Sequence, residues 1–324
     1  MNDLGKYLSF NSASLQGYTD YGIGIPMLDN RVLDTLSFLQ DKWKIEIEEF
    51  SVDHTNDLAL LELVHDEEFV KRVRENPEKH VLETYELIKS DGSYHRYDPD
   101  KAIKPLTDLI NRGMLHVHGT LYSAKRALEN GFCYHLGGGM HHAMTHRPGG
   151  FCMFNDIIIA LRKLRQEGYV KKGLVIDTDA HKGDGTAQCS SDDSAIDSLS
   201  IHMKNGWPLD GSSKDSFIPS TYDIPVSLED DYLNIYNNKL SSLNLSADLA
   251  IVVHGADVYE HDVLESAKGI QLSKEQCLER DKITYHYLKE RGIPQVWVMA
   301  GGYGPHVHEV FSQFIDYVLT DLQN

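Results

Sequence analysis

Short apolar runs that alternate with helix-like segments constrain the fold of this chain more than any other feature. Leu249–Val253 and Gln295–Met299 read as buried strands. Between them lies a helix-like segment that the pair Ser273 and Gln276 opens in the pattern of a capping box. Parallel strands need a crossover connection, so this alternation favours a parallel sheet. We therefore predict an α/β fold in which helices flank a central, mainly parallel sheet, as a single domain over residues 1–324.

Other segments support the same architecture. Leu174–Asp177 reads as a further strand. Further helices are expected at Pro26–Gln40, at Asp66–Glu75, at Gly119–Asn130 closed by Gly131, from Asn155 or Asp156 to Gly168, and from about His308. Two segments show little periodicity. Residues 77–104 are expected to form a surface excursion, and residues 203–231 a long loop, which in a compact domain is usually functional.

Composition excludes several classes of protein. The chain has 324 residues, of which 41% are hydrophobic, enough for a sizeable core. It carries 49 acidic and 31 basic residues, and the net charge of −18 argues against direct nucleic acid binding and suits cationic ligands. The four cysteines form no C-x-x-C pair, which argues against a structural zinc ribbon and a disulfide framework. Without a signal-like N-terminus or a membrane-length apolar run, we expect a soluble, cytoplasmic protein.

Polar motifs follow the expected strands directly. DTDAHKGD begins at Asp177, HGADVYEHD follows Val253, AGGY follows Met299, and LGGGMHH follows a short apolar patch at residues 132–134. Buried carboxylates without a positive partner cost several kcal/mol each. Ligand sites of open α/β sheets form beyond the carboxyl ends of the strands. We therefore expect these motifs to converge on one edge of the sheet.

The acids and histidines of these motifs predict a metal site. Asp179 and His181 are two residues apart, so in an extended chain they point to the same side. Asp262, beyond a different strand, is the expected third ligand. Two carboxylates and one imidazole are typical of a catalytic rather than a structural metal site. An isolated D-x-H motif would not be enough to predict a metal site. The prediction depends on the polar groups that follow the other strands.

The remaining polar groups suggest acid–base chemistry. His141 and His142 are adjacent. Asp177 and Asp184 have no other assigned role, and each could accept a hydrogen bond from Nδ1 of one imidazole and so fix its tautomer. Two Asp–His pairs beside a metal would form a general acid–base apparatus. Tyr303 follows two glycines at a strand end, where its hydroxyl could donate to an oxyanion. A solvated loop is the alternative interpretation of a histidine pair alone, and a lone tyrosine is more often a core or surface residue than a catalytic one.

Taken together, these motifs resemble a known family. LGGGMHHA, GFCMFND, IDTDAHKGDG, LSIH, GAD followed five residues later by Asp262, and AGGY are similar, in order and spacing, to the motif series of the zinc-dependent histone deacetylases. The resemblance runs from about Gly119 to the C-terminus and is weaker before that, in LVHDEEFV. HGTLYSAKRALENGF and QLSKEQCLERD most resemble the class IV branch. An arginase/deacetylase-like fold is implied.

The resemblance also implies roles for individual residues. Asp179, His181 and Asp262 would bind zinc (Zn2+), with iron (Fe2+) as an alternative. His141 and His142 would form the catalytic dyad, backed by Asp177 and Asp184, with Tyr303 as the donor in the transition state. A structural potassium ion (K+) would be bound through Asp177, Asp179 and Ser200. The residues implied to line the substrate channel are Gly150, Phe151 and Trp207.

Some positions depart from the family pattern. Lys182 stands where a second histidine is common, and His261 precedes Asp262 where glycine is usual. These departures, with Arg147 near the expected rim, leave the preferred acyl chain open. His116 with His118, and His306 with His308, have ligand-like spacing, but each pair is expected at a helix start without a metal role. Cys152 is expected to be a small buried hydrophobe.

We therefore predict a zinc-dependent amidohydrolase that removes acyl groups, acetyl or longer fatty acyl, from lysine side chains of proteins or peptides. An acetylpolyamine amidohydrolase would use the same groups and would suit the charge of −18 equally well. A catalytically silent acyl-lysine reader or scaffold is a third alternative, against which the joint presence of metal, dyad and tyrosine positions argues.

Overall fold

The computed structural model describes residues 4–47, 49–52 and 57–323. Within these residues one sheet of seven strands runs through the molecule, and each pair of neighbouring strands is parallel. The strands lie in the order β1–β2–β7–β6–β3–β4–β5. Their bounds are β1 Leu8–Ser9, β2 Phe132–His135, β3 Gly173–Asp177, β4 Ile196–Met203, β5 Tyr222–Val226, β6 Leu249–His254 and β7 Gln295–Met299.

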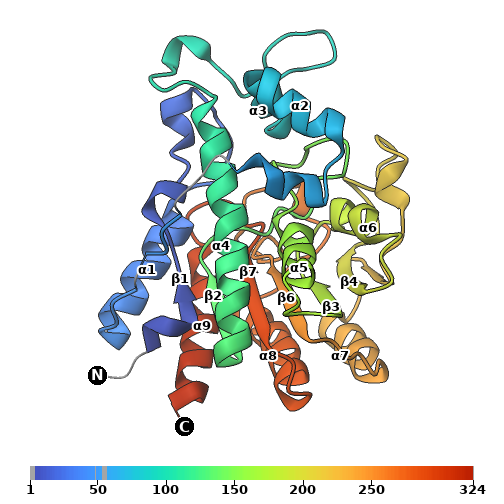
Figure 1. Cartoon of the computed structure of the whole chain (residues 1–324). Coiled ribbons are helices and arrows are strands. Elements are labelled where there is room, and N and C mark those ends of the chain that lie inside the picture. The colour runs from blue at the N-terminus through green and yellow to red at the C-terminus, as the bar shows by residue number, and fades with distance from the viewer. Residues whose placement is uncertain (1–3, 48, 53–56, 324) are drawn as a thin grey trace.

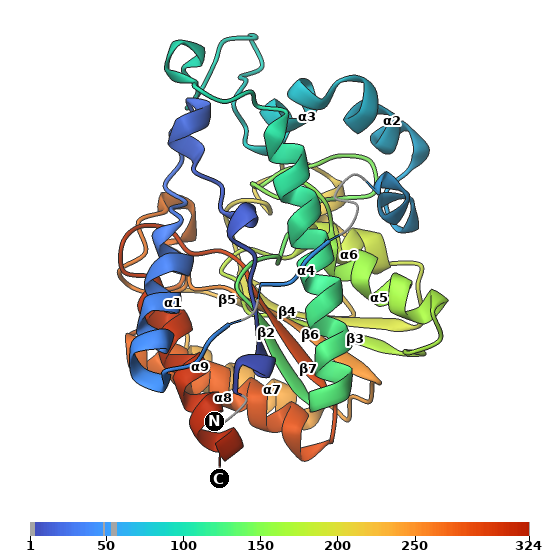
Figure 2. The same cartoon turned by 60° about the vertical axis from the view of Figure 1, so that its left-hand side comes forward.

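Helices cover both faces of this sheet (Figures 1 and 2). The α-helices are α1 Asn30–Trp43, α2 Glu67–Glu75, α3 Pro77–Thr84, α4 Asp108–Asn130, α5 Asp156–Gln166, α6 Asp184–Ser190, α7 Tyr232–Ser242, α8 Lys274–Glu290 and α9 His308–Gln323. Short 3-10 helices lie at Leu4–Tyr7, Ser12–Ser14, Tyr18–Tyr21, Leu58–Leu63, Pro99–Lys101, Asp215–Phe217 and Glu265–Ala267. In both views α4 and α5 lie on one face, and α7, α8 and α9 lie on the other.

The core is divided between these two faces by the alternation of side chains along each strand. In β7, Trp297 packs into the cluster formed with α1, α7, α8 and α9, whereas Val296 and Val298 pack into the cluster formed with α2 to α5. All three side chains are fully buried. Burial on both faces is why the strands of this parallel sheet read as nearly continuous apolar runs. The predicted α/β fold with a central parallel sheet is confirmed.

Several predicted boundaries agree with the structure. β7 spans Gln295–Met299 and α9 begins at His308, both as predicted. Ser273 and Gln276 form a capping box, in which each side chain accepts from the other residue's backbone N–H. Gly131 ends α4 in a left-handed conformation with a φ of 82°. The capping box and the closing glycine therefore marked these two helix ends correctly, whereas the helix expected at Pro26–Gln40 spans Asn30–Trp43.

Three local predictions were wrong. The helix expected from Gly119 begins at Asp108, so His116 and His118 lie inside α4 rather than at its start. α3 occupies Pro77–Thr84, in the segment expected to be a surface excursion. The segment expected to be a long loop contains β5, an edge strand that includes Pro225. Proline is tolerated in an edge strand, where not every N–H has to be paired.

No helix among the described residues is both long enough and apolar enough to cross a membrane. The four cysteines are buried and none is in a disulfide. The prediction of a single domain over residues 1–324 stays a prediction, and residues 1–3 and 324 lie outside the described part of the chain.

Candidate active site

The motif loops follow four strands that are neighbours in the sheet. β2, β7, β6 and β3 lie side by side, and neighbouring strands end within one residue of each other in register. His135 pairs with Val298, His254 with Met299, and Asp177 with Val253. Because the strands are parallel, their carboxyl ends share one edge, and the four following loops meet there. The predicted convergence of the motifs is confirmed.

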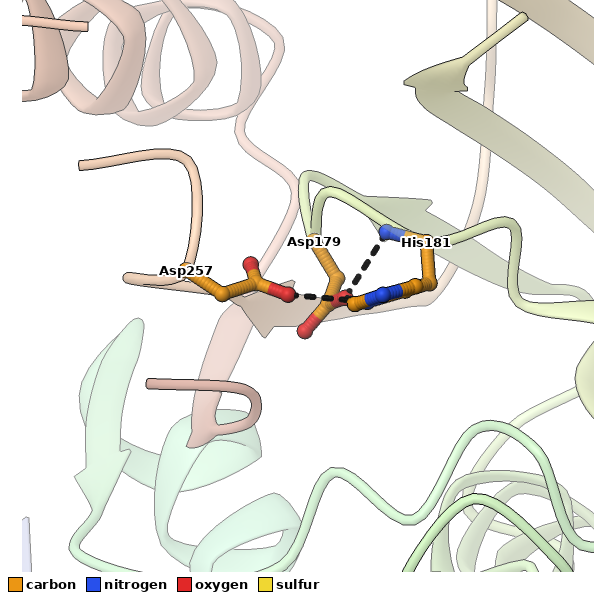
Figure 3. A group of neighbouring side chains, drawn as sticks. All are labelled: Asp179, His181 and Asp257. Carbon is orange, nitrogen blue, oxygen red and sulfur yellow. Dashed lines mark hydrogen bonds and ion pairs between the residues drawn. The ribbon is translucent and has the colours of Figure 1, made fainter. Parts of the chain in front are cut away.

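A buried group that could hold a metal ion lies at this edge. Asp179, His181 and Asp257 each offer a ligand atom, and these atoms lie within 4.8 Å of one another. Nδ1 of His181 is 3.0 Å from Oδ2 of Asp257 and 3.2 Å from Oδ1 of Asp179. Figure 3 shows Asp179 and His181 on one loop and Asp257 reaching toward them from another.

The charges of this group fit a cation. Burial lowers the pKa of His181, but hydrogen bonds to Asp179 and Asp257 and their negative charges outweigh burial and raise it to about 10. Burial and the Asp179 charge raise the pKa of Asp257 to about 6. The two buried carboxylates thus require a positive charge here, which either a proton on this ring or a bound cation in place of that proton supplies. Two carboxylates and an imidazole are also ligands that a catalytic metal ion takes.

The structure corrects the third member of the predicted ligand set. We expected Asp262 beside Asp179 and His181, and Asp257 is there instead. Both carboxylate oxygens of Asp262 accept backbone hydrogen bonds, Oδ1 from Leu264 N and Oδ2 from Tyr303 N, each at 2.7 Å. Asp262 therefore organises the loops around Tyr303. Asp257 stands in the same motif, as the aspartate of GAD, five residues earlier.

The two predicted Asp–His pairs are present. Nδ1 of His141 lies 2.8 Å from Oδ2 of Asp177, and Nδ1 of His142 lies 2.7 Å from Oδ1 of Asp184. A carboxylate only accepts hydrogen bonds, so each Nδ1 carries a proton and donates. The two rings are adjacent, with centroids 3.9 Å apart. Ser216 Oγ lies 2.6 Å from the other oxygen of Asp184 and fixes it further.

Their surroundings shift the pKa values of the two histidines in opposite directions. Burial lowers the pKa of His141, but the charges of Asp177 and Asp179 outweigh it and raise that pKa to about 9. Burial and the charged His141 lower the pKa of His142 to about 4, despite Asp184. Near neutral pH, His141 is an imidazolium and His142 is a neutral imidazole. With Nδ1 protonated, Nε2 of His142 carries the lone pair that can accept a proton.

A glycine turn places the histidines. Gly138 and Gly139 adopt left-handed φ angles of 75° and 76°. The carboxylate of Asp156, the first residue of α5, accepts from Gly139 N at 2.9 Å and from Met140 N at 2.7 Å. Thr120 of α4 holds the same carboxylate at 2.5 Å. Asp156 thus fixes the loop that carries the dyad, a role that its sequence position as a helix start did not indicate.

Tyr303 lies at the end of the loop after β7. It is 6% exposed, and its ring centroid is 6.0 Å from that of Phe151. Burial and the charges of Asp179 and Asp257 raise the pKa of Tyr303 well above its usual value, so the hydroxyl keeps its proton and can donate. Arg31 of α1 bonds the carbonyl oxygen of Ala300 at 2.6 Å and so restrains this loop. The sequence did not indicate a role for Arg31.

The predicted channel residues lie around the dyad. The ring centroid of Trp207 is 4.5 Å from that of His142 and 5.5 Å from that of His181. Gly150 has a φ of 54°, and a Cβ there would lie 2.4 Å from the Trp207 ring and 2.6 Å from the His142 ring. No larger residue fits this position. Phe151 also has a left-handed φ, of 64°.

Within the described part of the chain, three cavities reach His142, and two of them, an outer and an inner one, meet at the channel residues. The outer one is lined by Glu86, Arg96, His142, Gly150, Phe151, His181, Trp207, Leu264, Ser266 and Tyr303. The inner one extends toward α1 and α4, where His116 contributes to its wall. His142, Gly150, Phe151 and Tyr303 line both. A ligand that enters from the mouth would therefore pass the dyad and Tyr303 before it reaches the inner cavity.

Ser200 and Asp177 are register partners on β4 and β3, so two of the three predicted potassium ligands lie on neighbouring strands, and Asp179 follows in the loop after β3. In the structure Ser200 Oγ lies 3.0 Å from Nδ1 of His202. Lys182 is buried, and its Nζ donates to Ile218 O at 2.8 Å. His306 is exposed and contacts Glu309, which leaves it outside the site.

Comparisons with known proteins agree with this arrangement. A family model described as "Histone deacetylase domain" matches residues 25–321. The chain is 30% identical over 205 residues to an uncharacterized protein of Picosynechococcus sp., covering 62% of this chain and 66% of that protein. It is 30% identical over 203 residues to histone deacetylase 2 of Arabidopsis thaliana, covering 62% and 51%. It is 29% identical over 219 residues to the acetoin utilization protein AcuC of Staphylococcus aureus, covering 60% and 56%.

These matches span about half to two thirds of the length of each relative. The family model spans most of this chain and includes every motif loop at the edge of the sheet. The chain therefore belongs to the histone deacetylase domain family.

Proposed function

We propose that this protein is a zinc-dependent amidohydrolase that removes acyl groups from lysine side chains. The observation that carries the proposal is the meeting of three different groups at one place. His181 of the metal group, His142 of the dyad and Tyr303 all line the outer cavity. A metal, a base and an oxyanion donor are the groups that metal-assisted amide hydrolysis needs.

The proposed metal ligands are Asp179, His181 and Asp257. When bound there, the ion would polarise the amide carbonyl and acidify the attacking water. Nitrogen and oxygen ligands suit zinc, and Fe2+ is an alternative with the same ligand types. We also propose a structural K+ near Asp177, Asp179 and Ser200, as the family resemblance implies.

Proton transfer is assigned to His142. It is neutral near pH 7, and its Nε2 can take the proton from water as the amide carbon is attacked. The same nitrogen then returns the proton to the departing lysine amine. Asp184 holds the ring in this tautomer through Nδ1. Tyr303 donates its hydroxyl hydrogen to the oxygen of the amide as negative charge develops there.

His141 has a different role. Its pKa of about 9 keeps it protonated at neutral pH, so it is a poor base. Its positive charge lies between Asp177, at 2.8 Å, and Asp179, at 3.7 Å. The charge also lowers the pKa of the neighbouring His142. We infer that His141 balances the buried carboxylates and supports the developing negative charge.

The mouth favours acyl-lysine over acetylpolyamine. Besides the two site histidines, its charged lining residues in the described part of the chain are Glu86 and Arg96, one anion and one cation. Because these two charges offset each other, the mouth offers no net attraction for a polycation, whereas an acyl-lysine in a protein brings only its neutral amide into the channel. The name of one relative, histone deacetylase 2, supports the same substrate class. We keep acetylpolyamine hydrolysis as the second candidate because the net charge of −18 would attract such substrates.

One panel tests the proposal. Metal-replete protein is assayed against acetyl-lysine peptides, long-chain acyl-lysine peptides and acetylpolyamines, with and without a chelator. We expect chelator-sensitive turnover of acyl-lysine peptides. Faster turnover of acetylpolyamines would favour the second candidate. Binding of acyl-lysine peptides without turnover of any substrate would instead favour a silent reader. Further parts of the proposal are that the protein acts on protein or peptide substrates in the cytoplasm and does not bind nucleic acid.

A further inference from the structure

A fully buried charged network lies behind the metal group, away from the cavities. Arg280 and Asp281 are adjacent on α8, and both are 0% exposed. Nε of Arg280 donates to Oδ1 of Asp281 at 2.8 Å, and Nη2 lies 2.7 Å from the same oxygen as an ion pair. Neither residue lines the outer or the inner cavity. The proposed mechanism therefore leaves this charged pair without a role.

The guanidinium of Arg280 joins the two loops that carry the metal group. Nη1 donates to the carbonyl oxygen of Thr178 at 3.0 Å and to that of Gly255 at 2.8 Å. Thr178 immediately precedes Asp179, and Gly255 lies two residues before Asp257. The backbones of these loops are in close contact, because a Cβ at Gly255 would lie 2.4 Å from Cα of Asp179. The Arg280 side chain thus bonds both loops, in addition to the direct hydrogen bond from Ala180 N to Asp257 Oδ1.

The network continues into the strand that precedes the dyad. Nε2 of His254 lies 3.0 Å from Oδ2 of Asp281, and Nδ1 of His254 lies 3.0 Å from the hydroxyl of Tyr134 in β2. Since a carboxylate only accepts, Nε2 donates, and Nδ1 of the neutral ring accepts from Tyr134. Burial lowers the pKa of His254, which agrees with a neutral ring. Each hydrogen bond of the network thus has a defined donor, and His254 and Arg280 both donate to the carboxylate of Asp281.

Stability alone does not explain such a pair. Replacing a buried ion pair by apolar side chains is often neutral or stabilising, because taking two charges out of water is costly. The metal group has a more specific need. Asp179 and Asp257 are like charges whose ligand atoms lie within 4.8 Å of each other, so their loops must be kept together before an ion binds. A rigid guanidinium that bonds both backbones meets this need.

We propose that Arg280, oriented by Asp281, is a positioning residue for the metal group: it ties the Thr178 and Gly255 carbonyls together and so fixes Asp179 and Asp257 in the arrangement that binds the ion. The proposal rests on the metal site of the proposed function. It predicts that Arg280 affects metal affinity while touching neither metal nor substrate.

The test compares Arg280→Lys with Arg162→Lys. Arg162 of α5 is a matched control, because it also bonds two carbonyl oxygens, those of Leu63 and Cys189, and contacts a carboxylate, that of Asp193. It differs in being 26% exposed and in bonding no residue of the metal loops. Lysine keeps the positive charge but not the planar fork of donors. Zinc affinity of metal-free protein is measured by competition with a chromophoric chelator, alongside the Tm and the visible spectrum of the Co2+ form.

We expect Arg280→Lys to bind zinc roughly 10- to 100-fold more weakly, the loss that outer-shell partners of metal ligands typically cause. Its Co2+ spectrum should change. Arg162→Lys should lower the Tm while zinc affinity and spectrum stay as in the wild type. Unchanged zinc affinity in folded Arg280→Lys would overturn the proposal. If that variant does not fold, Tyr134→Phe decides, since weaker zinc binding supports the network and unchanged binding overturns it.

These outcomes are separate from failure of the proposed function. Wild-type protein that binds zinc but hydrolyses no acyl-lysine substrate would end the functional proposal, and the affinities of the Arg280 and Arg162 variants would still decide this one. Wild-type protein without measurable zinc affinity would overturn both.

Discussion

The identity of the third metal ligand gives the sharpest test of the site. Asp257 and Asp262 lie in one loop, both are buried, and sequence motifs alone pointed to Asp262. The structure places Asp257 with Asp179 and His181 and gives Asp262 two backbone donors. We therefore expect Asp257→Asn and Asp262→Asn to separate metal binding from loop structure.

The expected magnitudes follow from these contacts. Outer-shell partners of a metal already contribute roughly 10- to 100-fold to affinity. Loss of a direct carboxylate ligand should exceed that, so Asp257→Asn should weaken zinc binding by more than about 100-fold, or more than about 2.7 kcal/mol. In Asp262→Asn the amide NH2 must face either Leu264 N or Tyr303 N. One buried N–H is then unpaired, at a cost of about 1–3 kcal/mol in folding stability.

The assay is zinc titration of both metal-free variants with a chromophoric competitor, together with thermal unfolding and kcat on an acyl-lysine peptide. Asp262→Asn should keep zinc affinity within about tenfold of the wild type, as a residue outside the ligand set should. It should also have a lower Tm, and a lower kcat because the loops around Tyr303 lose one of the two hydrogen bonds that Asp262 accepts. The reverse pattern, with zinc lost in Asp262→Asn and retained in Asp257→Asn, would refute our assignment.

Other predictions address the dyad, the tyrosine and the buried histidines. Tyr303→Phe should keep zinc and lose about 10²- to 10³-fold in kcat with a smaller change in KM; a lower Tm with kcat intact would mean a packing role. His142→Ala should keep its metal and lose about 10²- to 10⁴-fold in kcat. In the wild type, kcat/KM should fall only as the pH drops toward about 4, because the neutral ring of His142 is the base. A fall in kcat/KM near pH 6.5 would contradict this assignment. Burial lowers the pKa of His65 and His116 to about 3 and that of His80 to about 4. The unfolded chain binds these protons near pH 6.5 and the folded chain does not, so the Tm should fall as pH decreases from 6.5 toward 4; a flat Tm over this range would oppose it.

Elements with strong local signals were predictable. The strand Gln295–Met299 is buried on both faces and therefore continuously apolar, and the capping pair Ser273 and Gln276 marks the start of α8 through its own hydrogen bonds. Elements that depend on distant partners were not. Gly119 weakens the helical pattern of α4, yet a Cβ there would lie 2.3 Å from the His135 ring. Close packing of helix on sheet requires that glycine, and the helix continues through it.

The site residues divide in the same way, into those with a local sequence signal and those that depend on distant partners. Asp179 and His181 follow a strand directly, so their spacing predicted that they act together, and the two Asp–His pairs had been matched correctly. Asp257 and Asp262 lie in a turning loop, where no fixed period tells which carboxylate faces the metal group. The direction in which the Asp262 carboxylate points is set by the hydrogen bonds that it accepts from Leu264 N and Tyr303 N. The sequence motifs predicted which loop carries the third carboxylate of the metal group. The hydrogen bonds of the folded chain determine which of its two aspartates that is.

Positioning residues are the hardest to find from sequence, for a physical reason. The groups that do chemistry follow strand ends, where glycines and acids break an apolar pattern. The groups that hold them lie in ordinary elements and act through backbone atoms: Asp156 at the start of α5 holds the dyad loop, and Arg280 is 102 residues from the Thr178 carbonyl that it bonds. Every residue has a backbone carbonyl, so the sequence does not show which carbonyl a distant side chain bonds. A buried arginine in the middle of a helix nevertheless needs acceptors, and where these lie in two site loops, its burial is evidence of what it positions.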